Sequence, residues 1–219
     1  MNNQIYLSKE ILNSLENPEI IPFKSGYKGY MVFSKEMNAE LYKKYGIKNT
    51  HRYYACYDLR NGKSEDVNII TFILFDPSTA NPKNPIDPTI SNCIYLAVKN
   101  EYNYVEIINI FSYRCSTVSA KCTENNKDNL EFIKKIIGDE TYKRDFVKAW
   151  GFGKENSSKL IQEQINSVKK ILIENEKPVM RLGVKDDAIK KLKEKILHPA
   201  KSTWCVFGGF EQSAELVKD

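Results

Sequence analysis

An aspartate follows directly on the most apolar stretch of the chain. The run VNIITFILF, residues 67–75, ends at Asp76, and Pro77 then fixes the chain direction. At the end of a buried strand, desolvation raises the pKa of a carboxylate unless partners stabilise its charge. Such a group can activate water, stabilise a cationic transition state or bind the polar edge of a ligand. Asp-Pro-Ser-Thr is also good turn chemistry, so position alone favours a capping role equally.

Three other polar residues occupy unusual positions. Asn109 interrupts the apolar run 104–111, and a buried amide must be hydrogen-bonded, either to a neighbouring loop or to the edge of a nucleobase. Arg114 follows that run and suits a phosphate or carboxylate, although a lone arginine is commonly part of a surface salt bridge. His198 lies in a short loop before Pro199. A single histidine is more often structural than catalytic, so each residue keeps two interpretations.

Aromatic residues stand at the ends of two apolar runs. Phe111 and Tyr113 follow one run, and Trp150 and Phe152 flank the end of another. Aromatic rings can supply a stacking surface for a base, but at strand ends they more often close the core. The segment around Gly151 has neither the spacing of a P-loop nor that of a dinucleotide-binding motif.

The elements that position these residues follow from alternating apolar runs and amphipathic stretches. Asp87 and Pro88 suit the N-cap and the first position of a helix. Strands are predicted at 67–75, 104–111, 145–150 and 177–183, and helices at 87–99, 126–139, 156–175 and 186–197.

This alternation predicts an α/β fold. We expect a three-layer α/β/α core domain over 67–219, with a mainly parallel four-stranded central sheet. Residues 1–66 are expected to form a β-rich N-terminal extension packed on it, with strands near 27–33 and 51–59. Ligands of open parallel sheets bind beyond the carboxyl ends of the strands, so the polar residues named above are predicted to converge there.

Composition narrows the function classes. Lys and Arg number 33 and Asp and Glu 28, a net charge of +5 that permits a polyanionic partner without requiring one. No apolar run reaches the roughly 18 residues of a membrane helix, and the N-terminus lacks the pattern of a secretion signal. Five scattered cysteines without a CxxC pair, and two histidines, indicate reduced thiols and neither a disulfide framework nor a metal site. We therefore expect a cytoplasmic protein without metal or cofactor and with no membrane partner.

Several of these motifs together resemble domain-of-unknown-function family 1643. The matching pieces are RYYACYDLR, FILFDPSTANPKNPIDPTISNC, IINIFSYRCST, ENNKDNL, VKAWG and the final Leu-Gly and His-Pro pairs, in order from Arg52 to Pro199. The chain departs from the family pattern at Asp76, where Asn is usual, and in a longer charged insert between Gly183 and His198. This resemblance implies membership of a family but no activity.

A more distant resemblance is to the uracil-DNA glycosylase superfamily. It is carried by Asp76-Pro77 at one strand end, Asn109 at the next, Trp150-Gly151 at a third, and His198-Pro199 in a late loop. Ala200 replaces the serine of that loop, and neither the glycine-rich entry nor the Ser-Pro loop that enters DNA is present.

That resemblance implies recognition of a nucleobase and cleavage of its N-glycosidic bond. Asp76 would stabilise the cationic sugar and orient water, His198 would donate toward the leaving base, and the base would be extruded from its stack. The partner would be a nucleotide or a nucleic acid that is single-stranded or presents a flipped base. The alternatives are a non-catalytic protein that sequesters a nucleotide and a domain that works through partners. The predicted ligand-binding residues are Pro77, Ser78, Thr79, Asp87, Asn109, Phe111, Tyr113, Arg114, Trp150 and Gly151.

Overall fold

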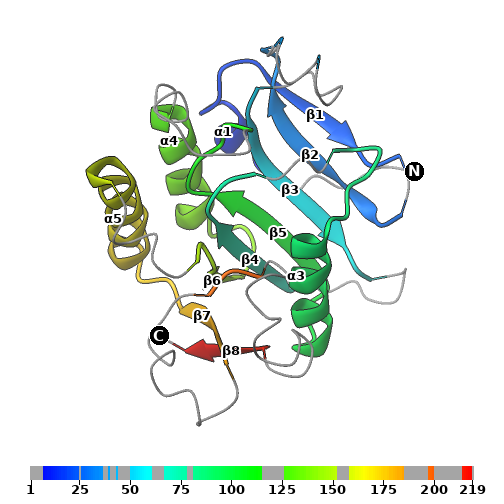
Figure 1. The fold of residues 1–219 in the computed structure, drawn as a ribbon, viewed down its shortest axis with the longest axis vertical. Helices are drawn as coiled ribbons and strands as arrows, with labels where there is room; N and C mark the ends of the chain where they lie inside the picture. The colour runs from blue at the N-terminus through cyan, green and yellow to red at the C-terminus, as the bar shows by residue number, and fades with distance from the viewer. Residues whose placement is uncertain are drawn as a thin grey trace.

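One mixed sheet of eight strands runs through the protein (Figure 1). The computed structural model describes residues 7–24, 26–36, 39, 43, 50–60, 67–77, 81–114, 126–151, 158–184, 197–199 and 214–218. The strand order is β1-β2-β3-β5-β4-β6-β7-β8. The strands are β1 (Pro18–Pro22), β2 (Lys28–Ser34), β3 (Arg52–Asp58), β4 (Ile69–Leu74), β5 (Tyr104–Asn109), β6 (Arg144–Lys148), β7 (Val179–Val184) and β8 (Ala214–Lys218).

The centre of the sheet is parallel and its flanks are antiparallel. β5, β4, β6 and β7 form the parallel set, which confirms the four predicted core strands. β3 pairs antiparallel with β5 and carries β2 and β1 beyond it, while β8 pairs antiparallel with β7. The sheet is therefore twice as wide as predicted, because three N-terminal strands continue it on one side and β8 continues it on the other. β1 and β8 were not predicted: each has only five residues, and β1 begins and ends with proline, which suits an edge strand.

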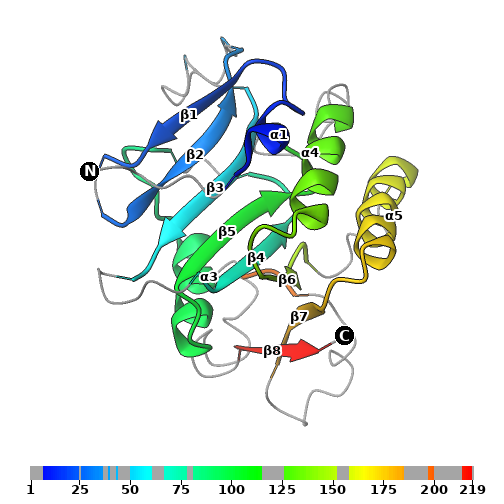
Figure 2. The ribbon, with the colours of Figure 1, turned by 180° about the vertical axis from the view of Figure 1, so that it is seen from behind.

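Helices cover both faces of the sheet (Figures 1 and 2). α3 (Pro88–Lys99) lies on one face, and α1 (Lys9–Leu12), α4 (Asn126–Gly138) and α5 (Lys159–Glu174) lie on the other. The predicted start of α3 is confirmed, since Asp87 Oδ1 accepts from the Ile90 amide at 2.9 Å. The helix predicted at 186–197 falls almost wholly outside the described residues. Among the helices that the structure describes, none has the length and apolar character needed to cross a membrane.

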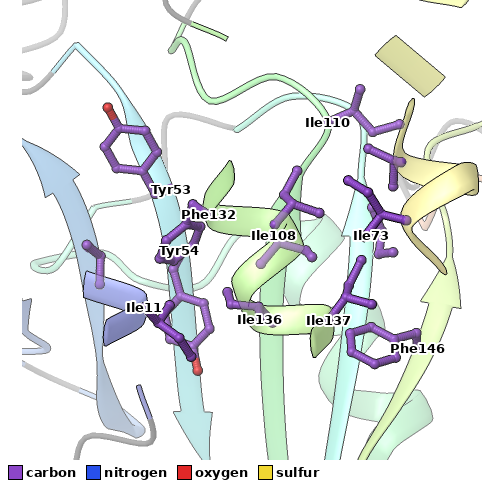
Figure 3. Packing of buried hydrophobic residues seen from close by; sticks show 14 of the residues in the cluster. Ile11, Tyr53, Tyr54, Ile73, Ile108, Ile110, Phe132, Ile136, Ile137 and Phe146 are labelled. Atoms are coloured by element: carbon purple, nitrogen blue, oxygen red, sulfur yellow. The ribbon is translucent and has the colours of Figure 1, made fainter. Parts of the chain in front are cut away.

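Two apolar clusters fill the space between the sheet and these helices. The α4-side cluster includes Ile108, Phe132 and Phe146 (Figure 3), and the α3-side cluster includes Ile107 and Ile94. Side chains alternate between the two along each strand, because successive residues of a strand point to opposite faces. On β5 this places residues 104, 106 and 108 on the α4 side and residues 105, 107 and 109 on the α3 side.

A buried carboxylate joins four strands on the α4 side. Glu106 of β5 is fully buried and accepts from Tyr54 Oη of β3 at 2.6 Å and from Thr71 Oγ1 of β4 at 2.7 Å. It also accepts from Arg144 Nε of β6 at 2.9 Å, and Arg144 in turn pairs with Asp139. Burial is the largest single influence on the pKa of Arg144 and lowers it, but the charges of Glu106 and Tyr54 and the hydrogen bonds to Glu106 and Asp139 together raise that pKa above its usual value. The charged pair is therefore stable only because each charge has its partner.

We predict that Glu106→Ala lowers the free energy of unfolding by about 3–5 kcal/mol in urea denaturation, because it leaves Arg144 charged and buried without its main partner. Glu163→Ala is the matched control: it removes a carboxylate from an ion pair with Lys159 in which both side chains are exposed. The control should leave the midpoint nearly unchanged. A loss in Glu106→Ala no larger than in the control would contradict the assigned role.

Candidate functional site

The carboxyl ends of the parallel strands meet where the chain changes direction through the sheet. β4 is the first parallel strand in the sequence, β5 lies on one side of it and β6 on the other. In open α/β sheets such a switch point forms the ligand-binding crevice. Backbone bonds hold the three strand ends together: Phe111 donates to the Phe75 carbonyl at 2.9 Å, and Ala149 to the Ile73 carbonyl at 3.0 Å. Asp76 and Pro77 follow β4 at this edge.

Two buried arginines lie on the α3 side of this edge. Arg52 pairs in register with Phe33 of β2, whose ring belongs to the α3-side cluster. The Cζ atom of Arg114 lies 5.3 Å from the centroid of the same ring. Only 1% of Arg52 and 3% of Arg114 is exposed, so both guanidinium groups are removed from bulk water. We call them the arginine pair.

The carboxylates of Asp76 and Asp87 act on Arg52, one member of the arginine pair. Burial lowers the pKa of Arg52, whereas Tyr57, Asp87 and Asp76 act in the opposite direction. Burial and the charge of Arg52 together lower the pKa of Arg114 to about 9. A guanidinium remains charged in proteins. The lowered pKa values of Arg52 and Arg114 therefore reflect the free-energy cost of holding two cations close together away from water. Anionic groups of the protein or of a ligand reduce that cost.

Asn109 ends β5 on the same side. It pairs in register with Leu74 at the end of β4, and its side chain has no exposed surface. Neither its Oδ1 nor its Nδ2 atom has a hydrogen-bond partner among the described residues. The Oδ2 atom of Asp87 is likewise buried and unpartnered within the described residues. Buried polar atoms in folded proteins are nearly always satisfied, so these groups suit a ligand that supplies a donor and an acceptor side by side.

His198 also belongs to the α3 side. Its neighbour Leu197 packs in the α3-side cluster and donates its amide to the Leu182 carbonyl of β7 at 3.2 Å. The Pro199 carbonyl accepts from Asn92 Nδ2 of α3 at 2.6 Å. The late loop is therefore attached to α3 and to the end of β7. His198 is half-buried there, on the same side of the sheet as the arginine pair.

The predicted aromatic contributors lie on the opposite side of the sheet. Trp150 and Phe111 are completely buried in the α4-side cluster, where Phe111 packs edge-on against Phe75 at 5.3 Å between centroids. Tyr113 packs edge-on against His51 at 5.5 Å. Trp150 and Phe111 close the core on the α4 side, which is the commoner role of aromatic residues at strand ends, and they do not share a face with Asn109.

The remaining predicted residues divide simply. Five of them lie on the α3 side of the sheet or at its edge: Asp76, Asp87, Asn109, Arg114 and His198. Pro77 and Gly151 are buried at the same edge, and Gly151 adopts a φ of 102°, which favours glycine after Trp150. Ser78 and Thr79 lie outside the described residues.

Sequence reasoning missed Arg52. The strand at 51–59 was predicted, but its antiparallel pairing with β5 was not. That pairing brings the first residue of β3 to the carboxyl end of β5, where the Arg52 amide donates to the Ser112 carbonyl at 2.9 Å. An arginine at the start of an otherwise apolar strand was the available signal.

His51 was also missed, and its ring packs against Tyr53 and Tyr113 on the α4 side. Its Nδ1 atom is 2.9 Å from Ser112 Oγ, and its ring stacks on Tyr53 at 5.8 Å between centroids. Only 3% of its surface is exposed. Burial lowers the pKa of His51 to about 4, although the charge of Asp128 acts in the opposite direction. The imidazole is therefore neutral at pH 7.

Comparisons with known proteins identify one family. The family described as protein of unknown function (DUF1643) matches residues 56–200. The matched segment begins within β3 and includes all of the parallel strands, Asn109, Arg114 and the His198 loop. No curated protein matches the chain, and no solved structure matches it.

We predict that the free energy of unfolding falls as the pH is lowered from 6.5 to 4, and that His51 contributes to this fall. In this window the unfolded chain protonates His51 and the folded protein does not, so unfolding takes up a proton. A shift from 6.5 to about 4 corresponds to about 3 kcal/mol in total. In urea denaturation at several pH values, His51→Gln should lose part of this pH dependence. If the free energy of unfolding depended on pH identically in the variant and in the parent, the contribution assigned to His51 would be contradicted.

Proposed function

Because the chain belongs to the DUF1643 family, whose description assigns no activity, we propose a function from the chemistry of the edge itself. The α3 side of the carboxyl edge recognises a nucleobase-containing ligand, either a nucleotide or an extruded base of a nucleic acid. The associated reaction that we propose is hydrolysis of the N-glycosidic bond.

The observation that carries this proposal is the buried Asn109 amide with no partner among the described residues. An amide presents one donor and one acceptor side by side, and nucleobase edges carry the complementary pair. The arginine pair, buried on the same side, suits the negative charge of a phosphate. Amide and guanidinium groups therefore support a ligand that combines a base with an anion, without a contribution from Trp150 or Phe111.

The hydrolytic step assigns roles to Asp76 and His198. As the glycosidic bond breaks, the sugar becomes cationic and the base leaves with the bonding electrons. Asp76 stabilises the sugar and orients the attacking water, and His198 donates a proton to the departing base. The resemblance to the uracil-DNA glycosylase superfamily in the Asp76-Pro77 and His198-Pro199 pairs supplies this choice of reaction.

A second function is a non-catalytic nucleotide-binding protein. The observation that favours it is the effect of Asp76 and Asp87 on Arg52, since both carboxylates raise the pKa of a buried guanidinium. A carboxylate that neutralises a buried cation already has a structural purpose. In this case Asn109 and the arginine pair bind the ligand, and Asp76 holds Arg52 in place.

Asn109→Leu separates a ligand-binding amide from a structural one. If a ligand satisfies Asn109, the leucine variant should be at least as stable as the parent without ligand, because a similar-sized apolar group replaces an unpaired amide. The same variant should lose the rise in melting temperature that nucleotides, nucleosides or short single strands give the parent by mass action.

The matched control for that variant is Asn129→Leu. The Nδ2 atom of Asn129 donates to the carbonyls of Asn109 and Ile110 at 2.9 and 3.0 Å, so its amide is used within the protein. Asn129→Leu should lower the melting temperature of the free protein. Equal destabilisation by both leucine variants, or no shift of the folded parent with any of the ligands, would contradict base recognition at Asn109.

Asp76→Asn tests the hydrolytic role. A carboxylate that acts on the developing sugar cation works in the transition state, so kcat should fall about 10²–10³-fold while ligand affinity is retained. Release of free base is measured from single- and double-stranded DNA, RNA and nucleotides. The control is Asp145→Asn, whose carboxylate accepts from Tyr102 near the other end of the sheet and should not affect turnover.

The resemblance to the family implies that asparagine is usual at position 76, so Asp76→Asn is also a change toward the common state of the family, and three outcomes are told apart. Unchanged turnover would remove the catalytic role of Asp76. An equal loss of affinity and turnover would make it a binding residue. Absence of turnover in a parent that binds nucleotides would favour the sequestering function.

A further inference from the structure

A cavity lies on the α4 side, across the sheet from Asn109. Its volume is about 210 Å³. Its walls come from the turn after α1, the end of β2, the start of β3 and the first turn of α4. We call it the Tyr53 pocket. The lining residues are Glu16, Asn17, Ser34, Lys35, Glu36, Tyr53 and Asp128.

A β-bulge turns Tyr53 into this pocket. β2 pairs Val32 with Tyr54 and Phe33 with Arg52, so Tyr53 is an extra residue on β3. The extra residue breaks the alternation of side chains, and both Tyr53 and Tyr54 reach the α4 side. Bulges commonly redirect a side chain next to a functional site. Without it, consecutive tyrosines of one strand would lie on opposite faces.

The Tyr53 hydroxyl has no hydrogen-bond partner among the described residues, although only 4% of the residue is exposed. Its ring is fixed between Phe132, at 6.0 Å between centroids, and the stacked ring of His51. Figure 3 shows the hydroxyl directed away from Phe132 and from the rest of the apolar cluster. The residue lines the cavity, so its hydroxyl is held facing the cavity and is available to a group bound there.

Negative charge converges on the same hydroxyl. Burial, followed by the charges of Asp128, Glu36 and Glu16, raises the pKa of Tyr53 to about 12. Among the described lining residues these three carboxylates are opposed only by Lys35. The charge of the pocket is thus negative in a protein whose net charge is +5. An anion is excluded by this field, and a cation is attracted.

We propose that the Tyr53 pocket binds a small organic cation through an ammonium or guanidinium group. The group would donate to the Tyr53 hydroxyl oxygen and to carboxylates that line the pocket. A metal ion fits less well, because within the described residues no three acidic, histidine or cysteine side chains are grouped to hold one. A volume of about 210 Å³ is below the usual range for drug-sized ligands and admits a short alkyl amine.

The probes are putrescine and agmatine, with 1,4-butanediol as a neutral control of similar length and Mg²⁺ as an inorganic control. Isothermal titration of the whole protein at pH 7.5 and low salt should show saturable binding of at least one amine. Binding should weaken at high salt because the pocket is open to solvent. Nα-acetyl-lysine amide presents the same ammonium on a peptide, so comparable binding of this probe would indicate a partner side chain rather than a free amine as the source.

Two variants and two controls locate the site. Tyr53→Phe keeps the ring and removes the hydroxyl, and Asp128→Asn keeps the shape and removes a charge; each should weaken amine binding about tenfold or more. Glu163→Gln on the exposed face of α5 and Asn109→Leu across the sheet should leave amine binding unchanged. An unaltered melting temperature for each variant shows that the fold is intact.

The proposal is overturned by any of three results. The first is absence of saturable binding of both amines to the parent, and the second is equal binding of butanediol or tighter binding of Mg²⁺. The third is amine binding that survives in folded Tyr53→Phe and Asp128→Asn. Because Asn109→Leu tests the other side of the sheet, failure of nucleotide binding leaves this test intact.

Discussion

The Glu106 carboxylate is the interaction that unites the two halves of this sheet. The parallel strands and the N-terminal antiparallel strands meet at β5, and Glu106 lies in the middle of that strand without solvent contact. It accepts from β3, β4 and β6 at once. A charge in this position is tolerated only if the strands that supply Tyr54, Thr71 and Arg144 hold the correct register. The polar network therefore favours one register over the others, whereas apolar side chains of similar size distinguish registers less sharply.

That register determines what meets at the carboxyl edge. With β3 fixed against β5, the first residues of β3 reach the end of β5 and lie beside the residues that follow β4. Arg52 then approaches Asp76 and Asp87, which are distant in sequence. A buried guanidinium needs anionic neighbours, and the two aspartates need a cation, so the α3 side of the edge is electrostatically self-consistent before any ligand arrives. Asn109 is the member of this group whose side-chain oxygen and nitrogen atoms both lack a hydrogen-bond partner among the described residues.

Periodicity in the sequence predicted the parallel core because β4, β5 and β6 are short apolar runs, each followed by an amphipathic helix, and β7 is a fourth short run. The same reasoning placed Asp87 as the cap of α3, since a capping side chain acts on its own helix. It did not predict the width of the sheet, because antiparallel pairing at a distance leaves no local pattern. It also assigned Trp150 and Phe111 to the same site as Asn109. A residue near the end of a strand can be assigned to an edge of the sheet from the sequence. The face of the sheet on which its side chain lies changes with every position along the strand.

The bulge at Tyr53 shows how much depends on a shift of one position. Arg52 faces the α3 side, whereas both Tyr53 and Tyr54 reach the α4 side. In an unbulged strand that kept Arg52 and Tyr53 in place, Tyr54 would face the α3 side and Glu106 would lose a donor. The extra residue keeps Tyr54 in the buried network while Tyr53 reaches the cavity beside it. The buried network and both faces of the edge thus depend on one irregularity in β3, and His51, stacked on Tyr53 and hydrogen-bonded to Ser112, holds the chain where that irregularity begins.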